Sequence, residues 1–163
     1  GSVLPLFINN IKLNKPLPIT DSEMTRFLIP LEKAINLVSF AIQEGDNGDI
    51  FIHKSNACNI LDLAEVLIDV FKSKSKIKII GKRKGEKIHE ILATKEEMKS
   101  SLKNKDYIII KNKEIKLNYD DYFKKGTKIQ NSNNLASNNA NFLDKKNLKK
   151  FLLSNKEFKK YLQ

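Results

Sequence analysis

The sequence holds only two arginines, and each lies in a turn-like stretch that could bind an anionic group. Arg26 lies in residues 18–27, after a Pro-Ile-Thr-Asp turn, and Arg83 lies between two glycines in residues 81–90. A guanidinium group is planar and can donate two parallel hydrogen bonds to phosphate oxygens, whereas a lysine ammonium group cannot. Glu86 follows Arg83 by three residues and could accept a hydrogen bond from a ribose hydroxyl. The two stretches therefore suggest a phosphate clamp with a sugar contact beside it.

A simpler interpretation of the same residues stays open at this point. An arginine near a helix start often makes only a local salt bridge, worth about 0–1 kcal/mol when it is exposed. Glu86 lies where a helix is expected to begin, and a carboxylate is favoured there by the helix dipole. Spacing alone allows both a phosphate clamp and a purely structural role.

The strong positive charge of the chain raises the alternative of a nucleic-acid partner. The net charge is +11, and 28 of the 30 basic residues are lysines, scattered along a sequence that is also rich in Asn and Ile. Nucleic-acid sites more often combine arginines with exposed aromatic side chains. We therefore expect the lysines to cover solvated faces and expect no nucleic-acid partner. A basic nucleic-acid-binding protein remains the weaker alternative.

The usual signatures of catalysis, metal binding and membrane insertion are missing. No Gly-x-Gly-x-x-Gly sequence opens a helix, so we expect no dinucleotide site in this chain. His53 and His89 have no metal-like partners in the sequence, and we expect no metal site. We expect no tyrosine–lysine pair on one helical turn, and hence no catalytic residue here. Cys58 is the only cysteine, which fits a reducing, cytoplasmic compartment. No apolar run approaches the roughly 20 residues of a membrane helix.

Hydrophobic periodicity predicts a mixed α/β or α+β fold in which strands and helices position the two arginine stretches. Helices are expected over residues 3–12, 30–44, 60–72, 86–92, 144–153 and 156–162, and one more at the capping box that begins with Thr94. Strands are expected over residues 49–53, 76–80, 106–111 and 114–118, with an edge strand or turn at residues 16–21. Residues 1–123 form the main region, residues 124–141 an Asn/Ser-rich loop or linker, and residues 142–163 basic C-terminal helices.

The two arginine stretches also resemble motifs of a known superfamily. The Met-Thr-Arg-Phe sequence of residues 24–27 and the Gly-Lys-Arg-Lys-Gly-Glu-Lys-Ile-His-Glu sequence of residues 81–90 are similar to motifs of the extended short-chain dehydrogenases/reductases. The nearest branch is that of the CapD-like polysaccharide-biosynthesis enzymes, which are UDP-glucose 4-epimerase-like and UDP-N-acetylglucosamine 4,6-dehydratase-like proteins. The likeness runs over about residues 1–123, and the motifs occur in the right order. Lys84 replaces a proline that is common in the dehydratase relatives.

The resemblance implies that the chain is the C-terminal, substrate-binding portion of such an enzyme, without its Rossmann core. Arg26 and Arg83 then lie on either side of the pyrophosphate of a UDP-sugar, and Glu86 lies at the uridine ribose. The backbone of Leu17, Pro18 and Ile19 then lies on the uracil side.

The resemblance also implies a cofactor, a reaction and partners for a longer parent protein. NAD(P) would be bound mainly by the missing N-terminal Rossmann domain, and the parent is expected to be a homo-oligomer. The implied reaction is a UDP-sugar 4-epimerisation or 4,6-dehydration in bacterial capsule or lipopolysaccharide sugar biosynthesis. We expect this chain to be inactive alone. The alternative is a non-catalytic UDP-sugar binding module from a split gene.

Overall fold

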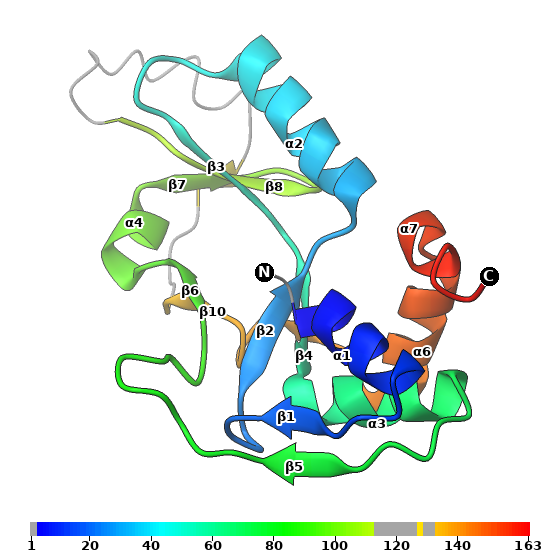
Figure 1. Ribbon diagram of the computed structural model, residues 1–163. Helices are drawn as coiled ribbons and strands as arrows, with labels where there is room; N and C mark the ends of the chain where they lie inside the picture. The colour runs from blue at the N-terminus through cyan, green and yellow to red at the C-terminus, as the bar shows by residue number, and fades with distance from the viewer. Residues whose placement is uncertain (1–2, 113–126, 129–132) are drawn as a thin grey trace. The chain divides into compact units, whose positions relative to one another are not determined.

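A computed structural model describes residues 3–112, 127–128 and 133–163 of the chain (Figure 1). These residues form two compact units, each built from separated parts of the sequence. Unit 1 contains residues 1–28, 56–90 and 137–163, and unit 2 contains residues 29–55 and 91–136. Both units combine helices with small sheets, which confirms the expected mixed α/β class.

Helices supply most of the hydrophobic core of unit 1. They are α1 (Val3–Lys12), α3 (Ile60–Val70), α6 (Lys145–Ser154) and α7 (Lys156–Lys159). Asn59 caps α3, because its side chain accepts hydrogen bonds from the amides of Leu61 and Asp62. Buried side chains from all four helices meet in one cluster, which includes Phe7, Leu63, Leu67, Leu148 and Phe158. The basic C-terminal helices are therefore part of the packed core of unit 1.

Two small sheets complete unit 1 and carry the first arginine stretch. Strand β1 (Leu17–Ile19) pairs in parallel with β5 (Ile77–Ile79). Strand β2 (Thr25–Leu28) pairs antiparallel with β4 (Asn56–Asn59), and β4 pairs in parallel with β11 (Asn141–Phe142). Strand β2 is an edge strand of its sheet, so one of its edges is available to another segment.

The described part of unit 2 contains a four-stranded sheet, a strand pair and two helices. The four-stranded sheet has the order β3 (Ile50–His53), β8 (Tyr107–Ile110), β7 (Ser101–Lys103), β9 (Thr127–Lys128). Strand β6 (Ile91–Ala93) pairs with β10 (Leu135–Ala136), and α4 (Lys95–Lys99) begins at the predicted capping box of Thr94 and Glu97. The ring of Phe40, on α2 (Leu31–Glu44), stacks on Tyr107 with the ring centroids 4.5 Å apart.

The apolar stripe of α2 is exposed in spite of its strong helical periodicity. Leu31, Ile35, Val38 and Ile42 are each more than half exposed, and no residue of the helix is buried. The apolar stripe therefore predicts the helix correctly but does not predict whether another part of the protein packs on that stripe. None of the described helices is long and apolar enough to cross a membrane.

Most of the expected elements are confirmed, and one expected helix is wrong. Residues 86–92 do not form a helix: residues 86–90 are irregular and lead into β6. The physical reason is tertiary, because carbonyl groups of this stretch accept hydrogen bonds from β2 rather than from their own helical turns. The strand expected at residues 114–118 lies outside the described residues. The expected linker at residues 124–141 contains paired strand residues at 127–128 and 135–136.

Candidate functional site

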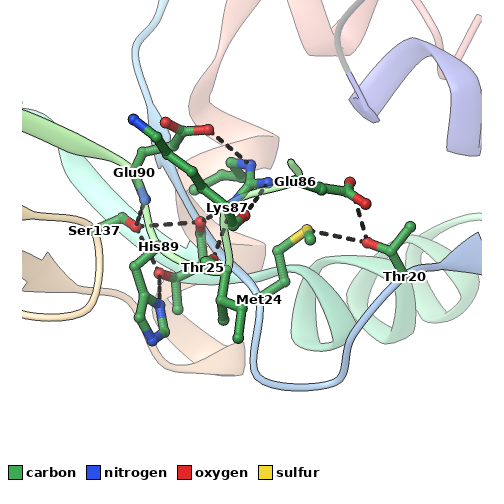
Figure 2. Close-up of polar contacts among 10 residues, drawn as sticks. Thr20, Met24, Thr25, Glu86, Lys87, His89, Glu90 and Ser137 are labelled. Atoms are coloured by element: carbon green, nitrogen blue, oxygen red, sulfur yellow. Dashed lines mark hydrogen bonds and ion pairs between the residues drawn. The ribbon is translucent and has the colours of Figure 1, made fainter. Parts of the chain in front are cut away.

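The two arginine stretches, which are about 60 residues apart in the sequence, lie side by side in unit 1. The amide of Thr25 donates to the carbonyl of Ile88 over 2.9 Å, so that residues 86–90 run along the free edge of β2. The Thr20 hydroxyl donates to the Glu86 carboxylate over 3.3 Å. The ammonium group of Lys82 pairs with Asp21 over 3.1 Å. The structure therefore brings together the stretches that the sequence analysis selected (Figure 2).

The Arg26 guanidinium group binds the second stretch of the chain itself. Its Nη1 donates to the carbonyls of Thr25, over 2.7 Å, and Ile88, over 3.0 Å. Its Nη2 donates to the carbonyl of Lys87 over 2.8 Å, and its Nε lies 3.6 Å from the Glu90 carboxylate. Arg26 therefore holds residues 87–90 against β2. A bound diphosphate could receive hydrogen bonds from this group only in competition with the chain carbonyls.

Arg83 lies in an exposed basic turn and differs from Arg26 in this respect. Within the described part of the chain, its guanidinium group makes no hydrogen bond or ion pair. Gly81 and Gly85, with φ of +82° and +81°, flank this turn. Other residues rarely adopt this left-handed conformation, so the glycines define the two ends of the turn. Lys82, Arg83 and Lys84 are all exposed in this turn, and Lys82 is paired with Asp21.

Glu86 is half-buried and already oriented by the chain. One carboxylate oxygen accepts from the Thr20 hydroxyl over 3.3 Å, and the other accepts from the backbone amide of Arg83 over 3.1 Å. Each carboxylate oxygen can accept more than one hydrogen bond. Glu86 is therefore held in place with acceptor capacity left for a hydroxyl group.

The side chains of β1 support the site from the core side. Leu17 and Ile19 are buried in the core of unit 1, and Pro18 between them is partly exposed. Since successive side chains of a strand point to opposite faces, only Pro18 and the backbone of β1 can face a ligand. The expectation that the backbone of this strand lies beside the base stays a prediction.

Asp21 adds a charged contact between the two stretches. Hydrogen bonds from the amide of Glu23 and from the Lys82 ammonium group lower the pKa of the Asp21 carboxyl group. Asp21 is therefore ionised at neutral pH and anchors Lys82, which precedes Arg83 in the basic turn. The pair is partly exposed, so it orients the turn more than it stabilises the fold.

Three residues that hydrogen-bond to one another beside the two stretches were not selected from the sequence, and these are Thr25, His89 and Ser137. Thr25 and Ser137 are buried, and the hydroxyl of Thr25 lies between Ser137 and the ring of His89. The sequence marked His89 only by its lack of metal-like partners, and Ser137 lies in the Asn/Ser-rich segment that was expected to be a loop or linker. No signal in the sequence distinguishes Ser137 from the neighbouring serines, because its role depends on a contact 112 residues away.

A tyrosine–lysine spacing of the kind expected to be absent occurs once in the chain. Tyr107 and Lys111 are four residues apart, but Tyr107 begins strand β8 and Lys111 follows its end. Four residues of a strand span about 13 Å, so the two side chains do not share a helical turn. Tyr107 stacks on Phe40, and Lys111 forms ion pairs with Asp46 and Asp49. The pair is therefore structural rather than catalytic.

Other reactive groups offer no second site in the described part of the chain. Burial raises the pKa of the Cys58 thiol to about 12, with a smaller contribution from Asp62, so the nucleophilic thiolate is absent at neutral pH. No group of three or more metal-ligating side chains occurs among the residues that the structure describes. The turn from β4 into α3 carries Asn59 where a dinucleotide-binding turn needs glycine. This turn is therefore not a dinucleotide-binding turn.

Comparisons with known proteins place these features in a family context. A family model described as polysaccharide biosynthesis protein matches residues 1–112. A UDP-glucose 4-epimerase of Rickettsia canadensis is 44% identical over 155 residues, covering 94% of this chain and 46% of that protein. A UDP-glucose 4-epimerase of Rickettsia rickettsii is 43% identical over the same length and with the same coverage.

A solved structure gives the same result for the fold. The X-ray structure of Pen from Bacillus thuringiensis is 31% identical, with a TM-score of 0.78, and the match covers 94% of this chain and 45% of that one. The present chain thus spans about half the length of the proteins that it matches. The family match confirms the resemblance stated from the motifs.

Proposed function

The chain belongs to the polysaccharide biosynthesis protein family, and from that premise we propose that it binds the UDP part of a UDP-sugar. One observation carries the proposal: two stretches from distant parts of the sequence lie side by side in unit 1, and the one arginine whose guanidinium is uncommitted there is Arg83. An exposed guanidinium group lies on the same turn whose backbone amide orients the Glu86 carboxylate, and these are the two kinds of group that can bind a diphosphate and a ribose hydroxyl.

Each residue of the site has a distinct role in the proposal. Arg83 donates to the diphosphate, because its guanidinium group is exposed and flanked by Lys82 and Lys84. Glu86 accepts from a ribose hydroxyl with the acceptor capacity that Thr20 and the Arg83 amide leave unused. Arg26 contributes positive charge from β2 while it holds residues 87–90 in place.

The reaction of the full enzyme is proposed to be a UDP-sugar 4-epimerisation. The similar Rickettsia proteins named UDP-glucose 4-epimerase support this choice over 4,6-dehydration, which remains the second candidate because the motif resemblance covers both. NAD(P), held by another part of the enzyme, would supply the hydride chemistry. This chain binds and orients the nucleotide end of the substrate, and that binding energy positions the sugar for reaction elsewhere. The chain alone is proposed to bind without turnover.

Calorimetric titration with UDP tests the proposal directly. The wild-type chain is expected to bind UDP, and Arg83→Ala is expected to weaken binding about 10- to 100-fold, the value of a hydrogen bond to a charged group. Arg83→Lys keeps the charge but loses the planar pair of donors, so it should restore binding only in part. Lys74→Ala is the matched control, because Lys74 is an exposed cation of the same unit that lies outside residues 18–27 and 81–90.

The same titration separates the alternatives. Equal UDP affinity of the wild type and Arg83→Ala would remove the phosphate role of this residue. No UDP binding together with steeply salt-dependent binding of RNA or DNA would favour the nucleic-acid alternative.

A further inference from the structure

A chain of buried hydroxyl groups lies behind the arginine stretches and is not used by the proposed binding roles. The Thr25 Oγ1 atom is 2.8 Å from His89 Nδ1 and 2.6 Å from Ser137 Oγ (Figure 2). The Ser137 Oγ also accepts from the amide of Glu90 over 2.9 Å and lies 3.2 Å from the carbonyl oxygen of Thr25. Three side chains from distant parts of the sequence thus meet in one hydrogen-bonded chain.

The hydrogen bonds among Thr25, His89 and Ser137 can be arranged in two ways, and each way gives every proton an acceptor. With His89 Nδ1 as an acceptor, Thr25 donates to His89 and Ser137 donates to the Thr25 hydroxyl. With His89 Nδ1 carrying a proton, His89 donates to Thr25, Thr25 donates to Ser137, and Ser137 donates to the Thr25 carbonyl. Neither arrangement leaves a buried hydroxyl group without a partner. The hydrogen bonds of Thr25 and Ser137 are therefore complete with either tautomer of His89.

The hydroxyl chain acts on the same backbone that holds Arg26. The Thr25 carbonyl, which Ser137 can reach, is also the acceptor of the shortest Arg26 hydrogen bond, at 2.7 Å. The hydroxyl groups also hold His89 and Glu90. These two residues follow directly after Lys87 and Ile88, whose carbonyls accept the other Arg26 hydrogen bonds. The segment is held at its other end through Glu86 by Thr20. Loosening the hydroxyl chain would therefore release the segment that orients Arg26 and Glu86.

We propose that Thr25, His89 and Ser137 are positioning residues, which set the affinity of the nucleotide-sugar site by fixing residues 86–90 against β2. This inference rests on the proposed binding of UDP. None of the three touches the ligand in the proposal, and each acts through Arg26 or Glu86.

The test is a hydroxyl deletion paired with its conservative rescue. Thr25→Val removes the hydroxyl and keeps the shape, and it is expected to weaken UDP binding about three- to tenfold, the equivalent of one hydrogen bond. Thr25→Ser keeps the hydroxyl and loses a methyl group, so UDP affinity should return to within about twofold of the wild type even though the melting temperature falls. Ser137→Ala provides a second, independent deletion with the same expected loss of affinity.

A matched control and a second readout separate positioning from stability. Thr94→Val also deletes a threonine hydroxyl, but in the α4 capping box of unit 2, so it should lower stability and leave UDP affinity unchanged. Amide hydrogen exchange of Glu90, whose N–H bonds to Ser137 Oγ, should accelerate in Thr25→Val and Ser137→Ala.

The outcomes distinguish the two proposals. Wild-type UDP affinity in Thr25→Val and Ser137→Ala, with weakened binding by Arg83→Ala, would overturn the positioning role and keep the proposed function. Failure of Thr25→Ser to restore affinity would equally contradict a hydroxyl-based role. No UDP binding by the wild-type chain would overturn both.

Discussion

Replacing Arg26 by alanine is expected to destabilise unit 1 in addition to any effect on ligand binding. The guanidinium group donates three hydrogen bonds of 2.7–3.0 Å to carbonyls of Thr25, Lys87 and Ile88. At about 1 kcal/mol net for each, these hydrogen bonds contribute roughly 3 kcal/mol. The Glu90 ion pair is partly exposed and adds only about 0–1 kcal/mol. Since water can reach part of the site after truncation, we expect a loss of about 2–4 kcal/mol in the free energy of unfolding.

Urea denaturation followed by circular dichroism measures this loss. Arg26→Ala should lower the urea midpoint, and Arg26→Lys should recover less than half of the difference, because an ammonium group lacks the planar, forked set of donors of a guanidinium group. Lys74→Ala should leave the midpoint unchanged, since this side chain is exposed. A midpoint of Arg26→Ala within experimental error of the wild type would refute the holding role assigned to this guanidinium group.

Other perturbations have expected outcomes that follow from burial, capping and charge. Leu63→Ala deletes a fully buried side chain and should cost about 2–5 kcal/mol, whereas Ile42→Ala, at 79% exposure, should change the free energy of unfolding by about 0.5 kcal/mol or less; urea midpoints compare them. Thr94→Ala breaks the α4 capping box and should cost about 0.5–2 kcal/mol, seen as faster amide exchange in that helix. Burial, and secondarily Lys33, lowers the pKa of His53 in the folded state, so its protonation favours unfolding. The contribution of neutral His53 to the free energy of unfolding is fully present above about pH 6.5, the pKa of an unfolded histidine. It should be lost as the pH decreases from there through the lower pKa of the folded state, and the loss should be smaller in His53→Gln.

Local signals predicted much of the fold because they act within a few residues. The Thr94 and Glu97 pair predicted the start of α4, and Asn59 predicted the start of α3. The apolar period of residues 60–67 predicted the buried face of α3, whose members include Leu63 and Leu67. These features depend on helix geometry alone, so the sequence contains all the information that they require.

Tertiary contacts account for what local patterns could not predict. The expected helix at residues 86–92 is absent because the Arg26 guanidinium group and the Thr25 amide donate hydrogen bonds to carbonyls of this segment. The apolar stripe of α2 predicted a helix, but periodicity does not say whether a partner surface covers it. Ser137 could not be selected, because it is distinguished by hydroxyl contacts with Thr25 and Glu90, which are 112 and 47 residues away.

The two stretches of the candidate site were selected from the sequence, but their geometry could not be predicted from it. The residue types of Arg83 and Glu86, and their spacing, indicated a phosphate and ribose contact. The sequence did not indicate that Arg26 would be held by the carbonyls of Lys87 and Ile88, since that depends on how the two stretches meet. The structure thus makes Arg83 the cleaner probe of ligand binding and Arg26 the cleaner probe of the fold.

The most direct test of the central claim is an NMR titration of the isotope-labelled chain with UDP. The account predicts saturable amide shifts concentrated in residues 18–27 and 81–90 of unit 1, with little change at Ile108 or Ile110 of the unit 2 sheet. Arg83→Ala should shift the saturation point to higher UDP concentration. Shifts that are unsaturable, or that spread over the lysines of both units, would contradict a specific site built from the two arginine stretches.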